Sequence, residues 1–219
     1  MLTPRLEILP ASQRRLWDEL GAIPPGFVLY GGTALALRLA HRASEDFDFF
    51  SNRAFRPDDL ERQIPFLEGT QRLQSSPNTL VSLVERDSPV KVSFFGGLSL
   101  KRVRDPEIVE GPGFRVASLL DLAATKVQVV QVRAEAKDYL DLGRLLEEGI
   151  DLAEALGAAR AVYGEAFNPL LSLKALSYFG DGDLRALPES LKSSLSGAVK
   201  KVDSARLPRF EPLAGGLAP

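Results

Sequence analysis

Residues 27–50 read FVLYGGTALALRLAHRASEDFDFF, and this stretch predicts the local fold. The apolar run Phe27 to Tyr30 is typical of a buried strand, and the two glycines that follow interrupt it. Thr33 to Ala40 is rich in alanine and leucine and predicts a helix, with Thr33 placed to cap its first turn. Asp46 to Phe50 then alternates acidic and aromatic residues, which is the pattern of a half-buried strand. The predicted order is therefore strand, tight turn, helix and strand.

Two features of this stretch have chemical consequences. Gly31 and Gly32 carry no side chain, so a bound anion can approach the backbone where the helix begins. Asp46 and Asp48 share one face of their strand, about 6.5 Å apart, and two carboxylates so placed can bind divalent cations that also hold phosphate oxygens. Each feature alone has an ordinary explanation, a simple turn or a solvated strand face. If the acidic strand returns beside the first strand, the two features come together and predict a phosphate-binding centre.

Outside this stretch, the predicted secondary structure changes near residue 117 from alternating strands and helices to helices alone. Before that point, short strands alternate with helices, and the segments 79–85 and 90–95 predict a β-hairpin. After it the pattern is helical, with helices expected over 118–132, 136–146, 152–163, 170–178 and 189–202. We therefore predict an α/β core over residues 1–117, a helical region over 118–206 that packs on it, and a mobile tail rich in proline and glycine over 207–219.

Composition narrows the classes of function. The 219 residues contain 27 Lys and Arg against 29 Asp and Glu, so nucleic acid or nucleotide must bind through a local basic patch rather than through overall charge. With no cysteine and one histidine, carboxylates are the plausible metal ligands. Neither a P-loop nor a dinucleotide-binding fingerprint occurs. The first ten residues lack the apolar core of a signal peptide, and no uninterrupted apolar stretch reaches 18 residues, so we expect a cytoplasmic protein.

Two segments together resemble a known family. The first runs from Gly31-Gly32-Thr33 through His41-Arg42-Ala-Ser44-Glu-Asp46-Phe-Asp48-Phe-Phe50. The second comprises Val116 to Lys126 and Arg133 through Lys137-Asp138-Tyr-Leu-Asp141. Both are similar to motifs of the AbiEii/AbiGii toxin-like nucleotidyltransferases, within the DNA polymerase beta type nucleotidyltransferase superfamily. The resemblance covers most of residues 26 to 205.

The resemblance implies an α+β fold, with a mixed β-sheet core of the nucleotidyltransferase type flanked by helices and a helical C-terminal half. It implies an Mg²⁺- or Mn²⁺-dependent enzyme that transfers a nucleoside monophosphate from an NTP to an acceptor hydroxyl. The acceptor would be RNA or a tRNA end, the role that of a toxin, and a partner the cognate antitoxin. Asp46 and Asp48 would bind metal, and Lys126 and Asp138 would complete the catalytic set. The nucleotide would contact Gly31, Gly32, Thr33, Arg42, Ser44, Lys126 and Arg133.

One position departs from the superfamily pattern. Its enzymes usually carry a third carboxylate on a later strand, where it helps to bind metal and takes the proton of the attacking hydroxyl. Here Ser93 stands at that position, within Val90 to Phe95. Asp121 or Asp138 substitutes for the missing acid, or the reaction runs without it, or the chain is a non-catalytic nucleotide-binding or protein-interaction module. A toxin acting on a protein or small-molecule acceptor is a third hypothesis.

The charged residues of the second half also have two interpretations. Lys126, Arg133 and Lys137 fall at helical spacing and would form a partly basic stripe that faces polyphosphate. They could equally form a solvated helix face with Lys137 paired to Asp141, and Asp138 and Asp141 could be ordinary surface acids. The sequence leaves these alternatives open.

Overall fold

The computed structural model describes residues 1–218, and their contacts divide the chain into two compact units. The first unit, the sheet unit, comprises residues 1–100, 105–118 and the C-terminal residues from 214. The second, the helical unit, comprises residues 101–104 and 119–213. The predicted boundary at 117/118 lies beside the observed change at 118/119. The structure also assigns residues 101–104 to the helical unit and divides the predicted tail between the two units.

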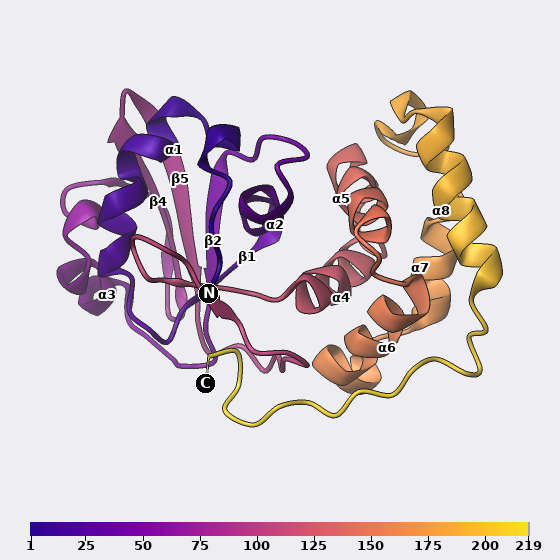
Figure 1. The fold of residues 1–219 in the computed structure, drawn as a ribbon. Coiled ribbons are helices and arrows are strands. Elements are labelled where there is room, and N and C mark those ends of the chain that lie inside the picture. The colour runs from indigo at the N-terminus through magenta and orange to yellow at the C-terminus, as the bar shows by residue number, and fades with distance from the viewer. Residues whose placement is uncertain (219) are drawn as a thin grey trace. The chain divides into compact units, whose positions relative to one another are not determined.

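The sheet unit is built on one mixed sheet of seven strands, drawn from indigo to magenta in Figure 1. In spatial order the strands are β3 (Gln71–Ser76), β4 (Thr79–Arg86), β5 (Ser88–Phe95), β2 (Asp46–Phe50), β1 (Val28–Tyr30), β7 (Arg115–Val116) and β6 (Glu107–Ile108). The acidic strand β2 lies antiparallel beside β1, as expected, and parallel to β5. Strands β4 and β5 form the predicted hairpin. The short strands β3 and β6 were not predicted from the sequence.

The alternating pattern of β2 decides which of its side chains enter the core. Phe47 and Phe49 are fully buried, whereas Asp46, Asp48 and Phe50 are partly exposed on the other face. Phe49 stacks on Phe94 of β5, with ring centroids 5.5 Å apart. Because a shift of one residue would bring the aspartates into this aromatic core, the register of β2 is strongly determined.

Three α-helices and three short 3-10 helices complete the described first hundred residues of the sheet unit. They are η1 (Leu6–Ile8), α1 (Ala11–Leu16), η2 (Trp17–Ala22), α2 (Gly31–Leu39), α3 (Pro57–Gln63) and η3 (Pro65–Leu67), so that three are α-helices and three are 3-10 helices. Helix α1 packs on β4 and β5, and α2 packs on β1 and β2. Arg38, near the end of α2, donates to the carbonyl oxygen of Ala117 at 3.0 Å and pairs with Glu107 at 2.5 Å. It thereby ties α2 to the β6–β7 side of the sheet.

The helical unit contains five α-helices among its described residues: α4 (Leu119–Val129), α5 (Ala136–Glu147), α6 (Leu152–Tyr163), α7 (Pro169–Ala175) and α8 (Glu189–Lys201), with 3-10 segments η4 (Gly164–Ala166) and η5 (Leu184–Ala186). Helix α4 packs on α5 and α6, and α5 also packs on α8. Asp151 and Glu154 form a capping box at the start of α6, which satisfies backbone donors there. All five predicted helices are present, with ends shifted by a few residues.

Two local predictions concern the N-cap of α2 and the C-terminal tail. The prediction that Thr33 caps α2 is wrong, because the helix begins at Gly31 and its N-cap is Tyr30. For the predicted mobile tail, Leu207 and Leu217 are buried, and the backbone N–H groups of Leu213 and Leu217 donate to Arg102 and Asn52. These contacts anchor the segment at two points. Its mobility stays a prediction. Residue 219 lies outside the described residues.

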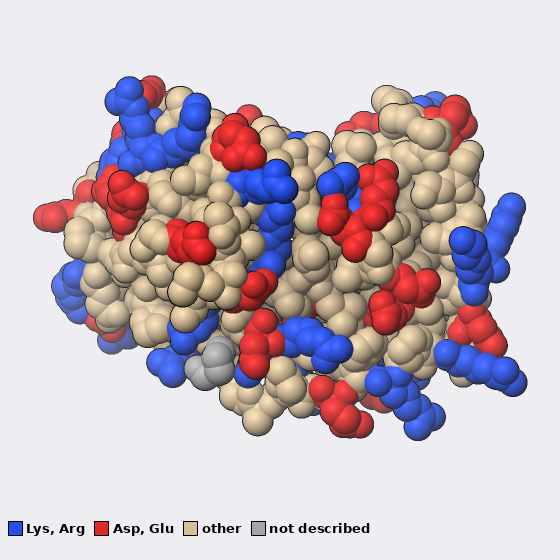
Figure 2. Space-filling model, viewed as in Figure 1, with Lys and Arg blue, Asp and Glu red and all other residues tan. Residues whose placement is uncertain are grey.

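Surface charge and helix hydropathy agree with the composition. On the face drawn in Figure 2, Lys and Arg side chains alternate with Asp and Glu, and no large area carries one sign. A membrane crossing needs a helix of at least 18 largely apolar residues, and no helix within residues 1–218 meets that requirement.

Candidate active site

The site in the sheet unit is built where β1 ends and α2 begins. Gly31 has φ +76°, a left-handed backbone conformation that favours glycine, and so the chain can turn directly from strand into helix. A Cβ atom on Gly31 would lie 2.9 Å from Oδ2 of Asp48, which is closer than real Cβ contacts come. The carboxylate of Asp48 therefore lies against the backbone at the start of α2. This is the juxtaposition that the sequence predicted.

The second glycine is covered by the loop that leads into β2. A Cβ atom on Gly32 would lie 2.7 Å from Oγ of Ser44 and 2.8 Å from Nη2 of Arg42. The hydroxyl and the guanidinium thus meet at the first turn of α2, where backbone N–H groups lack helical partners. Both residues were predicted to contact nucleotide. The structure brings them together with the glycines and with Asp48.

Thr33 holds this arrangement together rather than facing solvent. Its side chain is fully buried, and its hydroxyl donates to the carbonyl oxygen of Asp46, with Ser44 O at 3.5 Å. The hydroxyl therefore ties the first turn of α2 to the start of β2. Because the hydroxyl is engaged in this way, only the backbone N–H of Thr33 is left for the predicted contact with phosphate.

Two neighbours of the aspartates on β5 complete the geometry. The parallel register of β2 and β5 places Asp46 opposite Lys91 and Asp48 opposite Ser93. Nζ of Lys91 lies 2.7 Å from Oδ2 of Asp46, and these two side chains are 39% and 41% exposed. The sequence analysis missed Lys91. The available signal was its position two residues before Ser93, which puts it on the face of β5 that the third acid would occupy.

The predicted residues of the helical unit form a separate, buried charge network. Nζ of Lys126 lies 2.7 Å from Asp138 and 2.6 Å from Asp141, and these three side chains are at most 6% exposed. Arg133 donates to the two oxygens of Asp138 at 2.7 and 3.0 Å and is 42% exposed. The interpretation of Asp138 and Asp141 as surface acids is therefore wrong. Lys137, by contrast, is exposed and pairs with Glu135.

Opposing effects set the ionisation of Asp138. Burial opposes the charged form of its carboxyl, but the hydrogen bonds from Arg133 and the charge of Lys126 outweigh burial. The pKa of Asp138 therefore lies below its ordinary value, and the group is ionised at neutral pH. The four side chains Lys126, Arg133, Asp138 and Asp141 together carry no formal net charge.

Asp121, the other acid considered as a substitute for the missing carboxylate, accepts hydrogen bonds from the backbone. Its two oxygens accept the N–H groups of Val103, at 2.8 Å, and Arg104, at 3.1 Å, and the residue is 1% exposed. It therefore fixes residues 101–104 to the start of α4 inside the helical unit. A group of three or more His, Cys, Asp or Glu residues placed to hold a metal ion is not found within residues 1–218.

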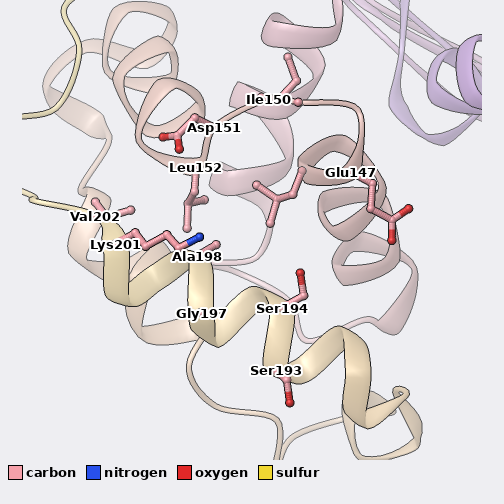
Figure 3. A pocket seen from close by; sticks show the side chains of 12 residues that line it. Glu147, Ile150, Asp151, Leu152, Ser193, Ser194, Gly197, Ala198, Lys201 and Val202 are labelled. Carbon is pink, nitrogen blue, oxygen red and sulfur yellow. The ribbon is translucent and has the colours of Figure 1, made fainter.

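A cavity of about 480 Å³ lies elsewhere in the helical unit. It is formed by α8 and by the segment that joins α5 to α6, and the side chains of Asp151, Leu152, Ala198 and Lys201 line it, as Figure 3 shows. None of the predicted site residues lines this cavity. The candidate chemistry therefore does not belong to it.

Comparisons with known proteins identify the family. The sequence profile described as "Nucleotidyl transferase AbiEii toxin, Type IV TA system" matches residues 15–211. Uncharacterized protein aq_aa25 of Aquifex aeolicus (strain VF5) is 34% identical over 158 residues, which are 71% of this chain and 74% of that protein. A match of this length shows the family rather than a shared motif alone.

Solved structures show the same fold. MenT4, a nucleotidyltransferase toxin of Mycobacterium tuberculosis H37Rv, superposes with a TM-score of 0.59 at 16% identity, over 86% of this chain and 82% of that one. A protein of H. pylori assigned as a nucleotidyltransferase superposes with a TM-score of 0.55 at 19% identity, over 86% and 90%. At these identities the likeness shows the fold alone.

The solved structures share the fold, a mixed α/β core followed by a helical second half, and the family match defines the chain as a nucleotidyltransferase. Within that class, the chain belongs to the AbiEii family of nucleotidyltransferase toxins from type IV toxin–antitoxin systems. The family generally uses an NTP and a divalent metal.

Proposed function

We propose that the chain transfers a nucleoside monophosphate from an NTP to an acceptor hydroxyl and releases pyrophosphate. The observation that carries this proposal is the contact of Asp48 with the glycine turn, where Gly31 leaves just enough room for the carboxylate. The carboxylate of Asp48 thus lies beside the turn whose backbone N–H groups we propose to bind phosphate. In the reaction, the acceptor oxygen forms a bond to the α-phosphorus, and the bond from that phosphorus to the pyrophosphate oxygen breaks.

The protein's own groups would bind and orient the triphosphate. Gly32 and Thr33 lie in the first turn of α2, where backbone N–H groups lack helical partners and the helix dipole also favours an anion. The guanidinium of Arg42 and the hydroxyl of Ser44 lie over the same turn and add donors for phosphate oxygens. These groups hold the α-phosphate in line with the incoming hydroxyl, and positioning is a large part of phosphoryl-transfer catalysis.

The residues present fit a divalent cation. Asp46 and Asp48 provide carboxylate oxygens on one strand face, and substrate phosphates would provide further oxygens, the donor set that Mg²⁺ or Mn²⁺ prefers. When bound there, the cation would neutralise charge that develops on the phosphate oxygens. Ser93 lacks the carboxylate that would accept the acceptor's proton, so this proposal assigns that proton to solvent or to the substrate's own phosphate.

The network in the helical unit forms the second part of the proposal. We infer that Lys126, Arg133 and Asp138 contribute to nucleotide binding, as the family motifs imply. Arg133 is the member that solvent reaches, because the other two side chains are at most 6% exposed. Since loss of Lys126 would also leave two buried carboxylates without their cation, Arg133→Met is the cleaner variant for measuring nucleotide affinity.

The favoured acceptor is RNA, for instance a tRNA end, and the favoured partner is a cognate antitoxin protein. Membership of a toxin family supports both proposals. The net charge of −2 means that RNA would be held by local basic groups such as Arg42 rather than by the field of the whole molecule.

The test uses the full chain with labelled NTPs, total RNA and Mg²⁺. We expect transfer of label to RNA, reduced at least about a hundredfold in Asp46→Ala and in Asp48→Ala because charge stabilisation at the reacting phosphate is lost. Asp58→Ala removes an exposed aspartate of α3 and should retain the rate of the unmodified protein. Transfer that persists undiminished in Asp46→Ala would reject the assignment.

The absence of an acid at position 93 favours a second candidate function. A non-catalytic nucleotide-binding module would keep the fold and would bind NTP with Mg²⁺ in calorimetry, but it would form no product. A toxin with a protein or small-molecule acceptor would transfer label to that acceptor instead of RNA. The same assay therefore separates the three hypotheses by whether label moves and where it goes.

A further inference from the structure

The acidic pair of β2 has a positively charged neighbour that the family motifs do not explain. The ammonium of Lys91 lies 2.7 Å from Oδ2 of Asp46, and both side chains are about 40% exposed. The strand register enforces this contact, because Lys91 stands directly opposite Asp46 in the parallel β2–β5 pair. One oxygen of the two-carboxylate set is therefore already engaged by a cation that belongs to the chain.

The same register shows where a third carboxylate is missing. Ser93 stands opposite Asp48 and is 2% exposed, so the face of β5 next to the aspartates offers a hydroxyl and an ammonium but no acid. The two acids considered as substitutes are engaged inside the helical unit, Asp121 by backbone N–H groups and Asp138 by Lys126 and Arg133. Two neighbouring divalent cations are usually held by several carboxylates. Among residues 1–218, the carboxylates identified at this site are those of Asp46 and Asp48.

The formal charge of the site allows the ammonium of Lys91 to take the place of a second divalent cation. Three carboxylates with two divalent cations carry a formal charge of plus one. Two carboxylates with one ammonium and one divalent cation carry the same formal charge, and the guanidinium of Arg42 at the neighbouring turn adds a further positive charge from the chain. We infer that this site takes a single divalent cation, and that the ammonium of Lys91 supplies the positive charge that a second cation provides in two-metal enzymes. This inference rests on the proposed function and concerns the same site.

An ordinary surface ion pair predicts a different outcome. Ion pairs as exposed as this one contribute little to stability, so Lys91→Met should leave the folded chain intact under either interpretation. If the pair is only structural, the variant should bind metal as the unmodified protein does. If Lys91 stands in for a cation, its loss should raise the affinity of the apoprotein for Mn²⁺ on the order of tenfold, because Asp46 loses a competing positive charge.

The test counts Mn²⁺ bound to the full chain with a non-hydrolysable NTP analogue, by calorimetry and electron paramagnetic resonance. We expect one Mn²⁺ per chain in the unmodified complex and two in the double variant Lys91→Met with Ser93→Asp, which restores the third acid. Lys200→Met removes an exposed lysine of α8 that has no ion pair among residues 1–218 and should change neither count nor affinity. Thermal unfolding of each variant checks that the chain is folded.

The outcomes separate this inference from the proposed function. Two Mn²⁺ in the unmodified complex, or unchanged Mn²⁺ affinity in Lys91→Met, would overturn the role of Lys91 while leaving the nucleotidyltransferase assignment intact. If the analogue and Mn²⁺ both fail to bind, the proposed function fails as well, and this inference fails with it.

Discussion

At the scale of single residues, buried charge distinguishes the two groups of predicted site residues. Asp46 and Lys91 are partly exposed, so each can exchange its partner for solvent or ligand at little cost. Lys126, Asp138 and Asp141 are buried, and the ammonium of Lys126 pairs with both carboxylates. Removing one partner from such a group leaves an uncompensated charge in a poorly solvated place. The two groups should therefore respond differently to substitution.

Lys126→Met should strongly destabilise the chain. The variant leaves Asp138 and Asp141 without their shared cation, and breaking a buried ion pair from one side costs about 3–5 kcal/mol. Urea unfolding followed by circular dichroism measures the loss. Lys137→Met, which removes an exposed lysine of α5, is the matched control and should cost less than about 1 kcal/mol. Equal losses in the two variants would show that the network does not hold the helical unit together.

At the scale of elements, the strand–turn–helix–strand segment from β1 to β2 concentrates the proposed chemistry in 23 residues, from Val28 to Phe50. Three features make it a single unit: the left-handed Gly31, the buried hydroxyl of Thr33 and the antiparallel pairing of β1 with β2. Gly31 joins β1 directly to α2, the hydroxyl of Thr33 ties α2 to the start of β2, and the strand pairing joins β1 to β2. The position of the carboxylates relative to the phosphate-binding turn is therefore set within this segment.

Gly31→Ala tests that coupling, with Gly113→Ala as its control. Both glycines have positive φ, +76° and +79°, so each substitution should cost about 1–2 kcal/mol in backbone strain. Only at Gly31 would the new Cβ meet a carboxylate, since nothing lies within 4 Å of a Cβ built on Gly113. We expect similar stability losses but a loss of Mn²⁺ and NTP binding, measured by calorimetry, in Gly31→Ala alone. Retained binding in that variant would place the functional carboxylate elsewhere.

At the scale of the whole molecule, we expect stability to depend on acid pH through the buried Asp138. Oppositely charged side chains nearly balance over the chain, so general repulsion contributes little near neutrality. Asp138 has a folded-state pKa below its unfolded value of 3.8. Its ionised form therefore stabilises the fold above that value, and the contribution disappears as pH falls through the lower folded pKa.

The expected result is a free energy of unfolding that falls as pH is lowered below about 5, with a reduced slope in Asp138→Asn. That variant should also be less stable at pH 7, because Lys126 and Arg133 lose a carboxylate. Denaturant titrations at several pH values provide the comparison. A variant whose pH dependence matches that of the unmodified protein would show that Asp138 does not link folding to proton binding.

The sequence by itself determined the local structure of the site. The pattern of residues 27–50 predicted β1, the glycine turn, α2 and β2, because alternation and helix propensity act between near neighbours in the chain. It also placed Asp46 and Asp48 on one strand face. The short exposed strand β3 and the true N-cap of α2 escaped prediction, since strand pairing and the geometry of the turn override weak local preferences.

Only the tertiary structure decided which charges meet. Lys91 reaches Asp46 because burial of the apolar face sets the register of β2 against β5, 45 residues apart in the chain at this pair. Lys126 bridges Asp138 and Asp141 because α4 packs on α5, so that a lysine which could have faced solvent on a basic stripe is buried in an ion-pair network. Such pairings depend on contacts between distant segments, and a residue pattern read along one segment does not contain them.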